Sequence, residues 1–206
     1  MLEEPGLYAI VDPTACGERD PERVAEAILR GGCALLQLRM KHGPDAPRLA
    51  LARRLAARCR AHGVPFVLND RADLAALTPA WLHLGQDDLP IAEARRLVDA
   101  PIGRSTHDEA QARAAVAEGA DLIAFGPVFD TRGKDAPDPT VGLDRLADVC
   151  AASPLPVVAI GGLTLERAPR VAATGARWGA AIGALCRADD PETAARALHL
   201  ALGGHA

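Results

Sequence analysis

Two cations and an amide recur at every second position of the segment QLRMK, residues 37–41. If this segment ends a β-strand, the alternation places Gln37, Arg39 and Lys41 on one face and Leu38 and Met40 on the other. Burying two cations without an anionic partner is costly, so their ligand should carry phosphate groups. An ordinary solvated loop is the alternative for this segment.

Carboxylates follow two further apolar runs of the chain. Asp70 lies in NDR, residues 69–71, and Asp88 in HLGQDDLP, residues 83–90. Carboxylate oxygens bind Mg²⁺, which they share with substrate phosphates, so the two aspartates predict a magnesium site. Alone this signal is weak, because an aspartate after a strand most often caps a helix. The neighbouring cations strengthen it.

Glycines follow two apolar runs near the C-terminus, in AIGGL (residues 159–163) and at Gly183. Their backbone N–H groups could close around a second phosphate, as they do in parallel barrels. Lys134 lies in a long loop rich in Pro and Asp, and loops of this length often act as lids. In GRSTH, residues 103–107, Ser105 could bind a ligand, whereas helix capping is the favoured role for His107.

The elements that must position these residues alternate along the whole chain. Eight short apolar runs, continuous rather than alternating in polarity, are separated by helical stretches, as in parallel strands covered on both faces. This repeat predicts an α/β fold, a single (β/α)8 TIM barrel over residues 1–206, with an open doubly wound sheet as the alternative. The expected strands are Leu7–Asp12, Ala34–Arg39, Pro65–Asn69, Trp81–Gly85, Ile102–Thr106, Leu122–Gly126, Val157–Gly161 and Gly179–Gly183. The expected helices are Pro21–Arg30, Pro47–His62, Ile91–Asp99, Asp108–Glu118, Leu143–Ala152, Leu165–Thr174 and Pro191–Leu202, with one weak helix after the third strand.

Composition narrows the range of partners. The 206 residues are 49% apolar but only 3% aromatic, so Ala, Leu, Val and Ile must build the core. A net charge of −4 argues against nucleic acid as a partner. The chain has neither a signal-peptide pattern nor an apolar run long enough to cross a membrane. Its five widely spaced cysteines suggest neither disulfides nor zinc, and we expect a cytoplasmic protein.

Taken in order, these motifs resemble the thiamine-phosphate synthase family over nearly the whole chain. The segments that carry the resemblance are QLRMK, NDR, HLGQDDLP, GRSTH, GPVFDT (126–131) with Lys134, GL (142–143) and AIGGL. Members of this family join hydroxymethylpyrimidine diphosphate to hydroxyethylthiazole phosphate, giving thiamine phosphate and pyrophosphate. In their mechanism, pyrophosphate leaves first and the thiazole nitrogen captures the pyrimidine-methyl cation.

The resemblance also implies roles for particular residues. Arg39, Ser105 and Lys134 would be catalytic, and Asp70 and Asp88 would bind Mg²⁺. The residues implied to bind the two phosphorylated substrates are Gln37, Arg39, Lys41, Asn69, Ser105, Thr131, Lys134, Gly162, Ile182 and Gly183. A homodimer is among the assemblies that the sequence allows.

Two positions depart from the family pattern. Gly133 stands where a hydroxyl residue commonly precedes the lysine, and Gly183 stands where a serine commonly contacts phosphate. The first alternative function is a thiazole tautomerase, although those enzymes typically have histidine in place of Pro127. The second alternative is a non-catalytic protein that binds thiamine intermediates.

Overall fold

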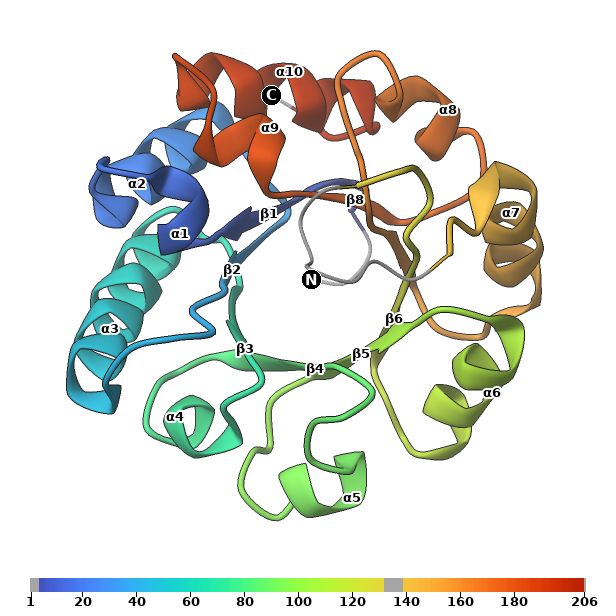
Figure 1. The fold of residues 1–206 in the computed structure, drawn as a ribbon, viewed down its shortest axis with the longest axis horizontal. Coiled ribbons are helices and arrows are strands. Elements are labelled where there is room, and N and C mark those ends of the chain that lie inside the picture. The colour runs from blue at the N-terminus through green and yellow to red at the C-terminus, as the bar shows by residue number, and fades with distance from the viewer. Residues whose placement is uncertain (1–3, 132–138, 206) are drawn as a thin grey trace.

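Eight parallel strands close into a barrel in chain order, and the helices form a ring outside it (Figure 1). The structure is a computed structural model that describes residues 4–131 and 139–205. The predicted (β/α)8 barrel is confirmed, because β8 pairs with β1 and leaves no open edge. The strands are β1 (Gly6–Val11), β2 (Leu35–Leu38), β3 (Phe66–Asn69), β4 (Trp81–Leu84), β5 (Ile102–Thr106), β6 (Leu122–Phe125), β7 (Val157–Ala159) and β8 (Trp178–Ala181).

The helices differ from the prediction mainly in length. They are α1 (Pro13–Cys16), α2 (Pro21–Gly31), α3 (Asp45–Ala61), α4 (Ala72–Ala76), α5 (Ile91–Ala94), α6 (Glu109–Ala117), α7 (Gly142–Ala152), α8 (Ala168–Ala172), α9 (Gly183–Cys186) and α10 (Pro191–Ala201). Helix α5 is shorter than predicted because Arg96 and Leu97 bond to carbonyls three residues back. None of the described helices is both long and apolar enough to cross a membrane.

The last predicted strand was wrong at its C-terminal end. Strand β8 stops at Ala181, and the chain turns at once into α9, which the sequence did not predict. The turn forms because the N–H groups of Leu185 and Cys186 both bond to the carbonyl of Ile182. Gly183 is therefore the first residue of a short helix and not the end of a strand.

The core has two layers separated by the barrel wall. Inside the barrel lie alternate residues of the strands, including Tyr8, Ile10, Val67 and Trp178. The intervening residues, such as Leu7, face the helices. The interior is largely aliphatic, as the composition predicted, and its aromatic side chains are those of Tyr8, Trp178 and the partly buried Trp81.

The barrel closes where the two ends of the chain meet. Helices α2 and α10 lie side by side next to the β1–β8 pair (Figure 1). Gly31 makes the close approach possible, because a Cβ there would lie 2.2 Å from the carbonyl oxygen of Glu192. Near the strand starts, a Cβ at Gly203 would lie 3.5 Å from the Cγ of Pro5. Leu7 N–H also donates to Nδ1 of His199 in α10 at 3.1 Å.

Candidate functional site

Four polar side chains line the barrel interior near the C-terminal ends of β2 to β5. Register fixes their direction, because Gln37 is paired with inward-facing Ile10, Asn69 with His83, and Ser105 with Ala124. The sequence predicted Gln37, Asn69 and Ser105 as site residues but gave no role to His83. A histidine within an otherwise apolar strand run was the signal available for it.

Hydrogen bonds link these interior side chains in pairs. Gln37 Nε2 donates to the hydroxyl of Tyr8 at 2.7 Å, and His83 Nε2 lies 2.9 Å from Ser105 Oγ. The Tyr8 ring packs edge-on against His83, with ring centroids 6.5 Å apart. Gly103 leaves room for the imidazole, since a Cβ there would lie 2.7 Å from His83 Nδ1. Gln37 and Ser105 are thus held in place without any ligand.

His83 is neutral at physiological pH because burial lowers its pKa to about 4. Asp88 opposes this shift, while Lys41 and Arg104 add to it. A neutral imidazole carries its single N–H on one of its two nitrogens. If Nε2 carries it, His83 donates to Ser105 Oγ; if Nδ1 carries it, the Ser105 hydroxyl donates to Nε2. His83 can therefore orient the Ser105 hydroxyl without adding charge to the interior.

Protein carboxylates already pair with the two cations that follow β2. Arg39 bonds to Asp12, and Lys41 Nζ lies 2.5 Å from Asp70 Oδ2. Arg39 and Lys41 therefore have anionic partners within the protein, and phosphate as their ligand stays a prediction. Asp12 was missed, although it directly follows the first strand, where it also caps α1 by accepting from Thr14 N–H.

Asp70 and Asp88 form a carboxylate pair across the ends of β3 and β4. Burial and then the hydrogen bond to Asp88 raise the pKa of Asp70. Burial opposes the fall in the pKa of Asp88, but the bonds from Asp70 and from Gly85 N–H, the latter at 2.6 Å, outweigh it. Two carboxylates this close to each other repel when both are charged, so a cation between them would be stabilised.

This pair suits Mg²⁺ better than a metal that needs a full set of protein ligands. The described residues contain no cluster of three His, Cys, Asp or Glu side chains able to hold a metal. Mg²⁺ commonly takes one or two carboxylates and completes its octahedron with waters and substrate phosphates. Asp70 also has a φ of +65°, the one positive value among the described non-glycine residues. Such backbone strain concentrates at functional sites.

Glycines after β7 approach neighbouring backbone too closely for any side chain. Both Gly161 and Gly162 have positive φ, and a Cβ at Gly162 would lie 2.6 Å from the carbonyl oxygen of Asp130. Arg167 braces this turn by donating to the carbonyl of Gly162 at 2.6 Å and by stacking on Phe129. The expected glycine turn is present, at the same end of the barrel as the carboxylate pair.

The remaining predicted residues differ in how far they are described. Ile182 precedes α9 and is partly buried between the two core layers. Thr131 is partly exposed at the start of the loop after β6. Lys134 and Gly133 lie outside the described residues. His107 is not the helix cap, because Asp108 caps α6, and its Nδ1 lies 2.6 Å from the carbonyl oxygen of Gly126.

Comparison with known proteins identifies the family. The family model described as thiamine monophosphate synthase matches residues 7–185. The chain belongs to the thiamine monophosphate synthase family. It is 46% identical over 199 residues to a thiamine-phosphate synthase of Anaeromyxobacter dehalogenans, covering 95% of this chain and 87% of the relative. A thiamine-phosphate synthase of Natronomonas pharaonis is 41% identical and is covered to 98%.

A solved structure gives the same result. Thiamine phosphate pyrophosphorylase from Pyrococcus furiosus superposes with a TM-score of 0.89 at 28% identity, covering 98% of this chain and 96% of that one. The predicted family and the transferase class are therefore confirmed along with the barrel. The roles assigned to single residues remain predictions within this synthase family.

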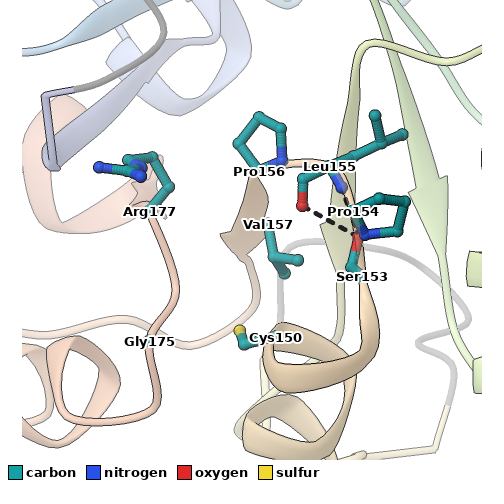
Figure 2. A pocket seen from close by; sticks show the side chains of 8 residues that line it. All are labelled: Cys150, Ser153, Pro154, Leu155, Pro156, Val157, Gly175 and Arg177. Atoms are coloured by element: carbon teal, nitrogen blue, oxygen red, sulfur yellow. Dashed lines mark hydrogen bonds between the residues drawn. The ribbon is translucent and has the colours of Figure 1, made fainter.

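A cavity of about 310 Å³, whose lining residues are drawn in Figure 2, lies at the strand-start end of the barrel. It is bounded by the end of α7 and by the segments that enter β7 and β8, including Ser153, Pro156 and Arg177. Burial raises the pKa of its one thiol, Cys150, to about 11, so this cysteine is not an activated nucleophile. The strand-start end of such barrels serves stability, and we assign this cavity no part in the synthase site.

Proposed function

We propose that this protein joins hydroxymethylpyrimidine diphosphate to hydroxyethylthiazole phosphate, releasing pyrophosphate and forming thiamine phosphate. One observation carries the proposal beyond family membership. The carboxylate pair with its neighbouring cations, the glycine turn after β7 and the start of α9 after β8 lie at the same end of one barrel. Two anionic substrates can therefore meet between them, which is what a transfer between two phosphorylated molecules requires.

The diphosphate binds on the side of β2 to β4. The residues implied to bind it there are Gln37, Arg39, Lys41 and Asn69, and the resemblance adds Lys134 from the segment between β6 and α7 as a fifth ligand. The cations neutralise the charge that develops on pyrophosphate as it departs, and electrostatic stabilisation of this kind often contributes most to the rate enhancement of an enzyme. Because Asp12 and Asp70 hold Arg39 and Lys41 beforehand, little reorganisation is needed when the substrate arrives.

Asp70 and Asp88 would hold Mg²⁺ on the same side. When bound, Mg²⁺ supplies positive charge to the leaving diphosphate as a Lewis acid. Lys41 Nζ, 2.5 Å from Asp70 Oδ2, already balances part of the negative charge of this pair. Ser105 faces the reacting groups from β5, oriented by neutral His83.

The thiazole phosphate binds across the barrel mouth. Gly162, Ile182 and Gly183 offer backbone N–H groups, and Thr131 lies at the start of the nearby loop after β6. This division gives each substrate its own part of the barrel. A cytoplasmic location and a homodimeric state remain predictions. All five cysteines are free thiols, as is usual for proteins of reducing compartments.

The first experiment is to assay thiamine phosphate formation by the purified protein, with both phosphorylated substrates and Mg²⁺. We expect product that EDTA abolishes and that Arg39→Ala or Lys134→Ala reduces by about 100-fold or more. Isomerisation of the thiazole phosphate without product would favour the tautomerase alternative. Binding of that compound without any turnover would favour the non-catalytic alternative.

The metal proposal has its own matched control. Asp88→Asn removes one member of the carboxylate pair and should lower the rate at fixed Mg²⁺ by about 100-fold, with a higher Mg²⁺ concentration for half-activation. Asp87→Asn removes the adjacent, exposed carboxylate and should leave both quantities unchanged. Equal behaviour of the two variants would contradict the assignment of the metal to Asp88.

A further inference from the structure

Gly183 is the position where the family commonly has a serine that contacts phosphate, and in this chain an arginine fills the space. A Cβ built on Gly183 would lie 2.0 Å from Nη2 of Arg187, 2.6 Å from its Cζ and 2.9 Å from its Nη1. The backbone of Gly183 does not require glycine, because its φ is not in the left-handed region. The absence of a side chain at position 183 leaves room for the guanidinium group of Arg187.

The guanidinium of Arg187 has no carboxylate partner in the part of the chain that the structure describes. Nor does its guanidinium donate a hydrogen bond to any of these described residues. It is not needed to cap α9 either, because Arg19 already donates to the carbonyls of Cys186 and Ala188, the latter at 2.6 Å. Arg187 is thus an exposed cation held over the backbone that should receive a phosphate.

We propose that Arg187 binds the phosphate of the thiazole substrate and replaces the serine hydroxyl that this chain lacks at position 183. The inference rests on the proposed function, because that function places a phosphate monoester at Gly183. A guanidinium offers two parallel N–H donors to a phosphate, where a serine offers one hydroxyl. Loss of the serine is then compensated within the same turn of helix, and the cation favours the phosphate ester over the free thiazole alcohol.

Binding measured by calorimetry tests Arg187 without relying on turnover. The full-length protein is titrated with hydroxyethylthiazole phosphate and, separately, with unphosphorylated hydroxyethylthiazole. Arg187→Ala should weaken binding of the phosphate ester about tenfold, as expected for one charge-assisted contact, and leave binding of the alcohol within about twofold. Arg170→Ala removes another exposed arginine, from α8, and should change neither.

Position 183 supplies a second, independent variant. Gly183→Ala places a methyl group where the guanidinium lies, and the flexible arginine can move aside without disturbing the backbone. It should lose the same affinity as Arg187→Ala, and the two losses should not add in the double variant. Gly183→Ser combined with Arg187→Ala should restore most of the affinity for the ester.

Two results would overturn the role of Arg187. One is an Arg187→Ala variant that binds ester and alcohol in the same ratio as the wild-type protein; the second is additive losses from Gly183→Ala and Arg187→Ala. Failure of the synthase proposal looks different. In that case no thiamine phosphate forms, while Arg187-dependent binding of the ester persists.

Discussion

At the scale of single residues, His83 combines full burial with a titratable ring. Its imidazole contacts Ser105 and Tyr8, and the buried Nδ1 has no hydrogen-bond partner among the described residues. Because the ring is neutral in the folded protein, protonation of the ring favours unfolding. This residue therefore links the polar interior to the stability of the barrel.

The sign of that linkage follows from the two pKa values. The pKa of His83 is about 4 in the folded protein and about 6.5 in the unfolded chain. Between these values the unfolded chain binds a proton that the folded protein does not, so stability falls as the pH falls. Between about pH 7 and about pH 5, the titration of His83 should lower the free energy of unfolding by about 2 kcal/mol.

Urea unfolding of wild type and His83→Gln at the two pH values measures this contribution. Glutamine keeps a polar end group toward Ser105 but does not titrate. The loss of stability on acidification should be about 2 kcal/mol smaller in the variant, and other titrating groups cancel in the comparison. An equal loss in both proteins would show that His83 is not held neutral.

Site residues were predictable from the sequence where the alternation of side chains along a strand alone determines which way they point. Gln37, Asn69 and Ser105 lie near the strand ends on the inner side, as expected from the positions of their apolar neighbours. Asp12 and Tyr8 were missed because their partners come from a different βα unit: Gln37 lies in β2 and Arg39 directly follows it. A single sequence does not show which side chain is opposite which, so cross-strand bonds appear only in the register.

At the scale of elements, capping explains which boundaries were predictable. Asp20 and Asp190 each precede a proline that opens a long helix, and both side chains accept a bond from backbone N–H groups. Short elements such as α1 and α9 lack a long periodic pattern. Their existence depends on how a turn packs at the barrel mouth, which the sequence pattern does not encode.

Asp190 is the cap whose value is most easily isolated. Its carboxylate accepts from the N–H groups of Glu192 and Thr193 and from the Thr193 hydroxyl. Asp190→Ala should lower the free energy of unfolding by about 1 kcal/mol, measured by chemical denaturation. Asp189→Ala, one residue earlier and exposed, is the control and should change it by less than about 0.5 kcal/mol.

At the scale of the whole molecule, stability depends on the seam where α2 and α10 meet. Gly31→Ala would ordinarily stabilise a helix by up to about 1 kcal/mol. Here the new methyl group would lie 2.2 Å from the Glu192 carbonyl oxygen and 2.9 Å from Ala195 Cβ, so the helices must separate. We expect a net loss of about 1–3 kcal/mol in urea unfolding.

A charge variant across the same seam separates packing from electrostatics. Arg30→Ala removes the ion pair between Arg30 and Glu192. Because the Arg30 side chain is 54% exposed, the free energy of unfolding should fall by less than about 1 kcal/mol. If Gly31→Ala were stabilising, the close approach of α2 and α10 would not be needed for closure. The sequence predicted a helix up to Arg30 but not its contact with α10, because the two segments are far apart in the chain.

Pro5 and Gly203 lie close together, so the eight βα units could be connected in a different order without changing how they pack. Pro5 and Gly203 are neighbours at the strand-start end, whereas the proposed substrate-binding residues lie at the opposite end. A short linker between these segments would turn the chain into a ring, which could be cut in a loop at the strand-start end. Such a circular permutant would keep every strand pair, so the same catalytic mouth could be encoded by a rearranged gene.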